Sequence, residues 1–326
     1  MTGLGRFYNQ PPVSVTQPDL SVIVLSWNVR ELLRDCLASL PLNDERIEVI
    51  VVDAASADGS VDMVRAEFPA ARLLPQAENL GYTRGNNIGL RAAQGRYLLI
   101  LNPDTTVVGQ ALRAMVDYME AHPEVGALGP QLTDPDGAVQ STRRRFPTLA
   151  TVFFESTWLE PLAPRSLLDR YYARDLPDGV VSQVDWVMGA ALLMRREAYA
   201  QVGGLDEGFF MYSEEVDWCR RLKAAGWQVV YFPLAHIIHH AGRSSEQVPA
   251  ATHIRFNASK VRYVGKVYGP MAALALRWFL LGGFALQLAL EAGKWAVGHK
   301  RPLRAARVQV YWRVLGSRLK GAGGGL

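Results

Sequence analysis

Hydrophobic and polar residues alternate in blocks along the first part of the chain, and these blocks predict strands and helices in turn. Buried strands are predicted at 20–27, 47–53, 71–76 and 97–101. Segments with helical spacing lie between and after them, at 31–40, 59–68, 84–94 and 109–122. This order predicts an α/β, Rossmann-like fold, with a mostly parallel sheet and helices on both faces.

The chain beyond residue 122 predicts shorter elements in a less regular order. Strands are predicted at 125–132, 136–140, 184–196 and 227–233, and helices at 197–202 and 213–226. Residues 141–180 are rich in proline and aromatic side chains and predict no regular element. We therefore divide the chain into a loose arm at 1–18, a main domain at 19–250 and a C-terminal helical region at 251–326.

The C-terminal region combines an apolar run with a cluster of cations. Met271 to Leu290 has about the length that spans a bilayer, but it contains Arg277, Gln287 and two central glycines. One acid, Glu291, stands against a set of cations that comprises Lys294, Lys300, Arg301, Arg304, Arg307, Arg313, Arg318 and Lys320. This pattern is typical of a segment on an anionic membrane surface, and we expect no nucleic-acid partner. A true membrane span and a soluble helical hairpin stay open as alternatives.

The composition and the two cysteines indicate where in the cell the protein works. With 49% hydrophobic and 20% charged residues, the chain falls among ordered globular proteins. Cys36 and Cys219 both lie in helical patterns among apolar neighbours, so we expect buried thiols in a reducing compartment. The expected location is cytoplasmic, with the cationic region holding the protein peripherally at the inner face of the plasma membrane.

The loops after the predicted strands indicate which classes of nucleotide the protein can bind. The first loop, SWNVR, has no glycine, which counts against NAD, FAD and, less strongly, S-adenosylmethionine, and no P-loop signature occurs. Asp53 ends the second strand and Asp104 follows the fourth, so both acids are expected at one edge of the sheet. Asp53 can accept a hydrogen bond from a pyrimidine N3–H or a ribose hydroxyl. Asp104 can bind Mg²⁺ or Mn²⁺ together with two phosphates. Each acid has a plain alternative as a helix N-cap.

Six blocks of sequence, taken in order, carry a family resemblance. They are SVIVLSWN, VVDAASADGS, ENLGYTRGNNIGL, YLLILNPDT, MGAALLMRREAYAQVGGLDEGFFMYSEEVDWCRRL and HHAGRSS. Over about residues 20–245 the chain resembles the inverting family-two glycosyltransferases of GT-A fold, in particular their bacterial rhamnosyltransferase-like branch. The resemblance implies sugar transfer from a nucleotide diphosphate-sugar donor to an acceptor hydroxyl, with a divalent metal.

The resemblance also implies metal ligands. NPD stands in the place of the family's D-x-D motif, with asparagine for the first acid, so Asp104 is the implied metal-binding residue. The family's H-h-G-G-x-S block aligns on His239, Gly242 and Ser244, which makes His239 the second implied ligand and His240 the alternative. Taken alone, each histidine could equally be a surface or capping residue.

An inverting transfer needs a base, and three acids at the start of the 213–226 helix are candidates. With Ser213 as the N-cap, Glu214 and Glu215 lie in the first turn, where the helix dipole would lower their pKa and keep them ionised. Such acids also stabilise a helix without doing chemistry. Asp217 can pair with an arginine of its own helix and is interpreted as structural. The family's base is the second residue of an E-D pair, which implies Glu215, with Glu214 next.

Further residues are predicted to bind the donor. Arg84 and Asn87 open a helix, where a guanidinium and backbone N–H groups can meet the diphosphate, although a capped helix with a solvated arginine would have the same pattern. Gly189 would let the backbone approach the sugar, and Trp186 would lie under the sugar ring or pack in the core. The arginine run at 143–145 would meet the diphosphate of a lipid-linked acceptor or form a solvated loop.

The residues and the resemblance together predict a glycosyltransferase with Glu215 as general base and Mg²⁺ or Mn²⁺ as cofactor. The resemblance alone implies dTDP-rhamnose as the donor, and the expected acceptor is a polyprenyl-linked or other cell-surface glycan. Two alternatives stay open. One is a nucleotidyltransferase of related fold, although SWNVRE lacks the glycine- and lysine-rich signature typical of that class. The other is a sugar-nucleotide-binding protein without catalysis.

Overall fold

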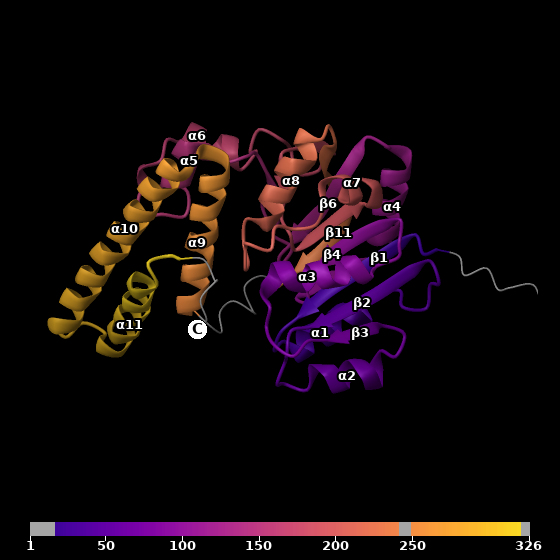
Figure 1. Ribbon diagram of the computed structural model, residues 1–326, viewed down its shortest axis with the longest axis horizontal. Coiled ribbons are helices and arrows are strands. Elements are labelled where there is room, and N and C mark those ends of the chain that lie inside the picture. The colour runs from indigo at the N-terminus through magenta and orange to yellow at the C-terminus, as the bar shows by residue number, and fades with distance from the viewer. Residues whose placement is uncertain (1–16, 241–248, 321–326) are drawn as a thin grey trace, which may run out of the picture.

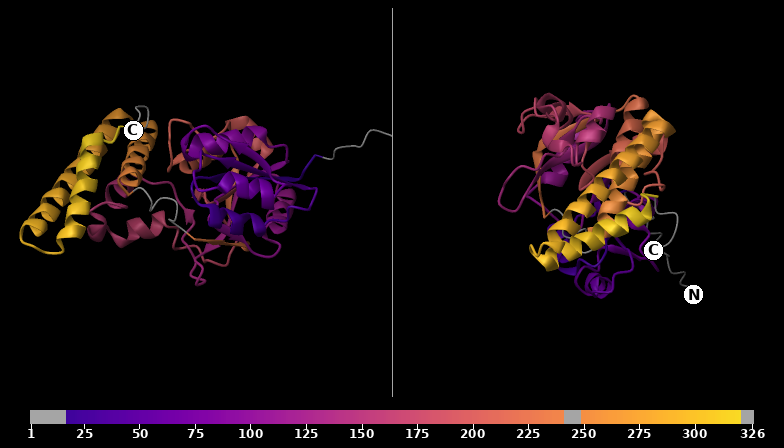
Figure 2. Two further views of the ribbon diagram at one scale, coloured as in Figure 1. Left: turned by 90° about the horizontal axis from the view of Figure 1, so that it is seen from below. Right: turned by 90° about the vertical axis from the view of Figure 1, so that its left-hand side faces the viewer.

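The computed structural model describes residues 17–240 and 249–320, which form an α/β domain and a C-terminal group of helices (Figure 1). The predicted arm at 1–18 therefore lies almost wholly outside the described residues. The two parts stand next to each other, with the sheet in one part and the long C-terminal helices at the opposite end of the molecule (Figures 1 and 2).

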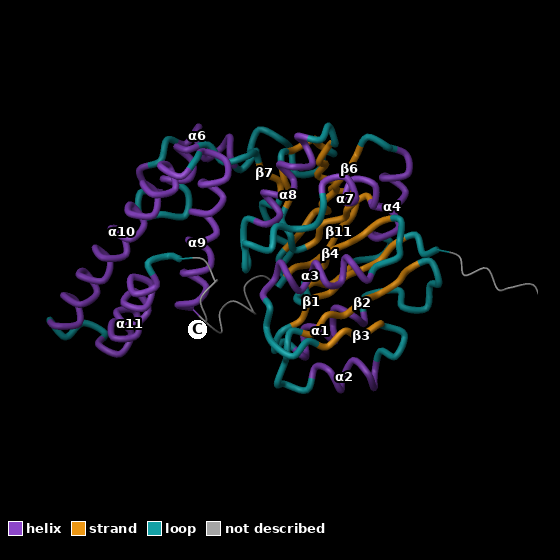
Figure 3. Tube along the Cα trace, viewed as in Figure 1, coloured by secondary structure: helices purple, strands orange, loops and turns teal. Residues whose placement is uncertain are grey.

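A nine-stranded sheet organises the α/β domain (Figure 3). Its order is β3-β2-β1-β4-β10-β6-β11-β5, and β8 pairs with β11 outside this path. The bounds are β1 (Leu20–Ser26), β2 (Ile47–Asp53), β3 (Arg72–Pro75), β4 (Tyr97–Leu101), β5 (Thr105–Val107), β6 (Val125–Thr133), β8 (Ser182–Val184), β10 (Ala191–Arg195) and β11 (Gln228–His239). The run from β3 to β4 is wholly parallel, whereas β5, β8 and β10 run antiparallel to their partners. The predicted α/β fold with a mostly parallel central sheet is confirmed.

Helices cover both faces of the sheet because the strand residues alternate between two cores. Val22 and Val24 pack in one core with α1 (Arg30–Ala38), α2 (Ser60–Glu67) and α4 (Ala111–Ala121). Ile23, between them, packs in the other core with α3 (Gly81–Ala92), α7 (Arg196–Val202) and α8 (Glu214–Ala224). Strands with apolar residues on both faces thus explain the continuous hydrophobic runs of the sequence.

Several predicted elements differ from the structure. The 136–140 strand is wrong, since only an isolated bridge joins Thr133 to Val139. The predicted 184–196 strand instead begins with the last residue of β8 and continues as two strands, β9 (Trp186–Val187) and β10, with a turn between them. Strand β9 pairs with β7 (Arg143–Arg144). Residues 141–180 are not irregular throughout, because they contain α5 (Leu149–Phe154), a 3₁₀ turn at Glu160–Leu162 and α6 (Arg165–Tyr171). Strand β11 continues six residues beyond the predicted end at 233, as far as His239.

Three helices form the C-terminal part: α9 (Pro249–Tyr268), α10 (Pro270–Ala296) and α11 (Arg301–Ser317). They share a small core that includes Val264, Leu276 and Val314, to which α5 contributes Val152. Helix α9 is also tied to the α/β domain, because Lys266 and Arg262 pair with Asp206 at 2.7 and 3.0 Å. The helices are therefore held against the domain.

Helix α10 has the length and composition of a possible membrane span. Within residues 17–240 and 249–320 it is the one helix long and apolar enough to cross a membrane. Only 22% of its most apolar window is buried. One of its two central glycines has a packing role, because a Cβ atom on Gly283 would lie 2.5 Å from the Trp158 ring.

Candidate active site

A cavity of about 320 Å³ opens at the carboxyl edge of the central sheet. This is the edge where ligands bind in open α/β sheets, beyond the ends of the parallel strands. Five of the residues singled out in the sequence line its wall: Asp104, Gly189, Glu214, Glu215 and His239. One cavity therefore contains both the expected metal-binding acid and the expected base.

Strand pairing brings Asp104 and His239 together from distant parts of the chain. β5 begins immediately after Asp104 and runs antiparallel to β11, so that Thr105 lies opposite His239. The His239 Nε2 atom is 3.5 Å from the Asp104 Oδ1 atom, and both side chains are buried. His240 instead donates its backbone N–H to the Asp104 carbonyl at 2.8 Å, and its side chain does not line the cavity. The geometry favours His239 over His240 as the side-chain partner of Asp104.

The hydrogen bonds behind His239 determine which ring nitrogen faces Asp104. The Gln140 amide nitrogen donates to Asp134 at 2.7 Å and to the His239 carbonyl at 2.8 Å. Its amide oxygen is left to accept from His239 Nδ1–H at 2.9 Å. His239 Nε2 then carries a lone pair that faces a carboxylate oxygen, which suits a cation between them. Their 3.5 Å separation is also longer than the roughly 2.7–2.9 Å of a charge-assisted N–H···O bond.

A divalent metal that prefers oxygen and imidazole ligands fits this pair. Mg²⁺ and Mn²⁺ both take carboxylate ligands, and Mg²⁺ commonly uses one or two protein carboxylates when substrate phosphates complete its shell. In the described part of the chain, no group of three or more His, Cys, Asp or Glu side chains could hold a metal. A metal bound between Asp104 and His239 would thus need further ligands from a substrate.

The two glutamates reach the cavity through a strained turn before α8. Tyr212 and Ser213 both adopt left-handed conformations, with φ of 72° and 67°. Such conformations cost free energy for residues other than glycine and are concentrated at functional sites. Ser213 holds the N-cap position expected of it, but its side chain makes no capping hydrogen bond. The turn directs Glu214 and Glu215 to the cavity wall.

Burial, and not the helix dipole, controls the ionisation of these two acids. Burial raises the pKa of Glu215 to about 7, against the opposing effects of backbone N–H groups and Arg144. The pKa of Glu214 is raised well above its ordinary value, first by burial and then by Glu215. The expectation that the dipole keeps both acids ionised is therefore wrong, because desolvation outweighs it. A pKa near neutrality suits Glu215 as a general base.

Gly189 lies in the turn between β9 and β10, next to Glu215 of α8 and the half-buried Tyr82. Its carbonyl accepts a hydrogen bond from the Tyr82 hydroxyl at 2.8 Å. A Cβ atom at position 189 would lie 3.2 Å from that hydroxyl and 3.7 Å from the Glu215 Cβ. The missing side chain keeps this part of the wall free for a ligand.

Asp53 is buried at the end of β2, beside the cavity-lining residue Ala54. Its Oδ1 atom accepts from the Ser56 backbone N–H at 2.9 Å, while Oδ2 is buried without a partner among the described residues. The side-chain oxygens of Ser26 and Asn102, at the same edge of the sheet, also lack one. Unsatisfied buried acceptors are costly, so this edge is suited to a ligand that donates hydrogen bonds.

Comparison with known proteins decides the family. Residues 21–220 match the sequence profile of the family described as glycosyl transferase family 2. The chain belongs to this family. It is 33% identical over 280 residues to the N-acetylglucosaminyl-diphospho-decaprenol L-rhamnosyltransferase of Mycobacterium tuberculosis, across 82% of this chain and 91% of that protein. It is 27% identical over 228 residues to the rhamnosyltransferase WbbL of Escherichia coli, across 68% of this chain and 83% of the relative.

A solved structure confirms the fold of this family 2 glycosyltransferase. The mannosyltransferase PcManGT of Pyrobaculum calidifontis, solved in complex with GDP-Man and Mn²⁺, superposes with a TM-score of 0.54 at 18% identity. The match covers 92% of this chain and 86% of that one. The predicted family, GT-A fold and enzyme class are confirmed, and the readings as a nucleotidyltransferase or a non-catalytic protein are set aside.

Four residues predicted to bind the donor lie outside the cavity wall of the glycosyltransferase: Asp53, described above, and Arg84, Asn87 and Trp186. Arg84 is exposed and lies 3.7 Å from a surface glutamate. Asn87 is buried and braces the loop before α8, donating to the Leu205 carbonyl at 2.8 Å and accepting from its N–H at 3.0 Å. Trp186 packs in the core and donates its indole N–H to a backbone carbonyl at 3.1 Å. Asn87 and Trp186 are corrected to structural positions, because their polar groups have partners within the protein. Donor binding by the exposed Arg84 stays a prediction.

The arginine run at 143–145 is paired within the protein and does not form a solvated loop. Arg143 is buried and pairs with Asp178 at 2.6 Å, and Arg145 pairs with Asp175 at 2.6 Å. Arg144 stacks on a tyrosine ring, with its guanidinium carbon 4.6 Å from the ring centroid. These contacts hold the segment around α6 against β7, so we do not assign the run to the acceptor diphosphate.

Asp217 has the structural environment expected of it. It is buried and pairs with Arg221 of its own helix at 3.0 Å and with Lys266 of α9 at 2.5 Å. This acid therefore joins α8 to α9 and is sealed away from the cavity by two cations. Gly242 and Ser244, the other positions of the histidine block, lie outside the described residues.

Three residues at the site were missed by the sequence analysis: Gln140, Tyr82 and Arg255. Arg255, in α9, is the one lysine or arginine lining the cavity within the described ranges. Its guanidinium carbon is 4.1 Å from the Phe210 ring centroid, burial lowers its pKa, and no described carboxylate pairs with it. An unpaired cation here can offset the charge of a diphosphate. Arg255 carries no local signal, because it belongs to a helix that the sequence assigns to a separate region.

Proposed function

We propose that this family 2 glycosyltransferase transfers a rhamnose-like sugar, with inversion and with a divalent metal, from a nucleoside diphosphate to a lipid-linked N-acetylglucosaminyl acceptor. The name of the mycobacterial relative, which is similar over most of both chains, supports this donor and acceptor class. The observation that carries the chemistry is the shared cavity, where the Asp104–His239 pair and Glu215 meet.

In this reaction Glu215 accepts the proton of the acceptor hydroxyl while that oxygen attacks the anomeric carbon of the donor sugar. A new C–O bond forms on one face of the sugar, the bond to the diphosphate breaks on the other, and the diphosphate leaves with the electron pair. Bound Mg²⁺ or Mn²⁺, held by Asp104 and His239, would supply Lewis-acid stabilisation of the departing diphosphate. Arg255 adds a second positive charge, and Asp53 accepts a hydrogen bond from the nucleoside.

The reaction belongs at the cytoplasmic face of the plasma membrane in this proposal. A polyprenyl-linked acceptor keeps its long apolar chain in the bilayer, since each buried CH₂ contributes about 0.8 kcal/mol. The sugar to be extended therefore stays within reach of the membrane surface. A peripheral enzyme can meet both this acceptor and a soluble nucleotide-sugar.

A donor panel with and without metal tests the function. We expect a thymidine or uridine diphosphate sugar to raise the melting temperature only when Mg²⁺ or Mn²⁺ is present. With a short-chain lipid-diphospho-N-acetylglucosamine acceptor, one diphosphate nucleotide should be released per sugar transferred, and the anomeric configuration by NMR should be inverted. Asp104→Asn should abolish the metal-dependent shift. Donor binding that is equally strong without metal would refute the assignment of the Asp104–His239 pair.

A further inference from the structure

One face of α10 is exposed along most of the helix and carries no polar side chain. Between residues 271 and 293 every exposed position is apolar or glycine, and these positions recur at helical spacing. The large side chains of this surface, which we call the apolar stripe, are Met271, Leu274, Trp278, Leu286 and Leu290. Met271 is 75% exposed and Trp278 is 67% exposed. A soluble protein seldom leaves so continuous an apolar surface uncovered, so the stripe needs an occupant.

The hairpin that carries the stripe is also cationic. Glu291, the last acid of the sequence, is buried and accepts a hydrogen bond from Arg304 at 2.6 Å. Every other lysine and arginine from 294 to 320 is exposed. Glu291 also lies 3.3 Å from Lys294 and 3.8 Å from Arg307, and one acid cannot offset the whole set of cations. Trp295 and Trp312 lie among these cations and are 47% and 69% exposed. Exposed tryptophans among cations are typical of a protein surface that meets lipid headgroups.

The positive charge of the hairpin helps to decide what covers the apolar stripe: a second copy of the chain, the interior of a membrane or an anionic lipid surface. Two copies of the hairpin would bring uncompensated cations together, which disfavours a second copy of the chain. A membrane span would require α10 to leave the core that it shares with α9 and α11, and would carry Arg277 into the hydrocarbon. An anionic lipid surface satisfies both features, because it accepts the apolar stripe and neutralises the cations.

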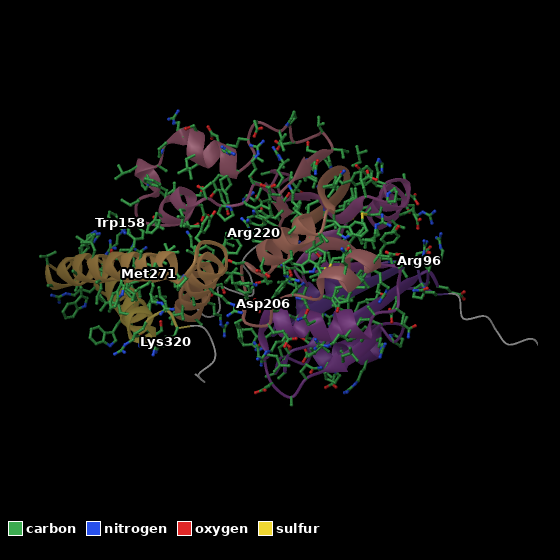
Figure 4. The ribbon with its side chains drawn as sticks, turned by 45° about the horizontal axis from the view of Figure 1, so that its top comes forward. Arg96, Trp158, Asp206, Arg220, Met271 and Lys320 are labelled. Atoms are coloured by element: carbon green, nitrogen blue, oxygen red, sulfur yellow. The ribbon has the colours of Figure 1, made fainter. Side chains whose placement is uncertain are left out.

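We propose that the α10–α11 hairpin lies flat on an anionic bilayer, with the apolar stripe inserted at the boundary between headgroups and acyl chains. The hairpin forms the end of the molecule far from the sheet, with Met271 and Lys320 both on this C-terminal part (Figures 2 and 4). Its surface is rigidly connected to the cavity, because α9 packs against α10 and also carries Arg255 into the cavity wall. The proposal rests on the proposed function only for its purpose, which is to bring the cavity to a lipid-linked acceptor.

Co-sedimentation of the full chain with lipid vesicles tests this surface. Vesicles of phosphatidylcholine are compared with vesicles that also contain phosphatidylglycerol. We expect the wild type to bind the anionic vesicles and to bind the neutral vesicles only weakly. High salt should release it from the anionic vesicles. The double variant Trp278→Glu/Leu286→Glu should bind the anionic vesicles at least tenfold less. Leu234→Glu, at a 71% exposed position on the α/β domain, is the matched control and should bind like the wild type.

Four outcomes would overturn the proposal. Two concern binding: a wild type that does not bind anionic vesicles, and a stripe variant that binds them as well as the wild type. The other two are protein that resists extraction by alkaline carbonate, as a membrane span would, and a lipid-independent dimer that the stripe variant abolishes, as a second copy on the stripe would. Circular dichroism and melting curves check that the variants are folded.

Activity separates this proposal from the proposed function. The stripe variant should keep wild-type turnover on a water-soluble, short-chain acceptor and lose most of it on a polyprenyl acceptor embedded in vesicles. If the wild type transfers sugar to neither acceptor, the proposed function fails, whereas vesicle binding still decides the docking surface independently.

Discussion

Replacing Glu215 with glutamine removes the proposed base while leaving the shape of the cavity almost unchanged. The wild-type carboxyl has a pKa of about 7 because it is buried. Turnover of the wild type should therefore rise about tenfold per pH unit below this value and level off above it. At about pH 6, roughly a tenth of the molecules carry the ionised base. Above pH 7 the Glu215→Gln variant should lose on the order of 10²- to 10⁴-fold in kcat relative to the wild type, and this ratio should shrink as the pH falls below 7 and the wild-type base becomes protonated.

The same substitution should change the pH dependence of stability in a defined direction. The ordinary pKa of a glutamate is 4.5, whereas that of Glu215 in the folded protein is about 7. At a pH between these two values, the unfolded chain has released the Glu215 proton and the folded protein still holds it. Wild-type stability thus falls as pH rises through this window, by about 3 kcal/mol at roughly 1.4 kcal/mol per pH unit. Glutamine has no charge to bury. The variant should then match the wild type near pH 4 and exceed its free energy of unfolding by about 3 kcal/mol near pH 8.

Urea unfolding at both pH values, together with kcat measured across the range, checks this reasoning. Glu45→Gln, at an exposed position, serves as the control and should alter neither quantity. Retained turnover in the Glu215→Gln variant would refute the role of the base. A variant that is less stable than the wild type at both pH values would instead show that Glu215 acts as a structural hydrogen-bonding group.

Other changes at the cavity have separate expected results. Asp104→Asn should weaken Mn²⁺ binding by at least tenfold, measured by calorimetry in the presence of a nucleoside diphosphate, and unchanged affinity would exclude this ligand. Gln140→Ala should weaken the same binding by about 10- to 100-fold while the metal-free protein melts within a few degrees of the wild type, because Gln140 orients the imidazole. Gly189→Leu should raise the KM for the donor and also lower stability, since even its Cβ atom would lie 3.2 Å from the Tyr82 hydroxyl, which must then shift. Arg255→Ala should lower kcat on the order of 10²-fold and weaken product inhibition by the nucleoside diphosphate, and it should leave metal-free folding unchanged.

The sequence by itself determined the α/β architecture and the carboxyl edge that carries the site. Continuous apolar runs such as 97–101 report burial on both faces, and such burial requires helices on both sides of a parallel sheet. Because the carboxyl ends of parallel strands meet at one edge, Asp53 and Asp104 could be placed there without coordinates. The match to a known family then supplied the chemistry that these positions alone left open.

The tertiary structure decided which side chains meet and how they ionise. His239 faces Asp104 because β11 continues past Pro233 and pairs with β5, a register that no local pattern encodes. Glu215 titrates near neutrality because packing excludes water, which outweighs the helix dipole that the sequence does report. Arg255 reaches the cavity because α9 folds back onto the α/β domain. Local residue patterns specify local backbone structure and burial, whereas contacts between distant segments and the resulting desolvation exist only in the folded chain.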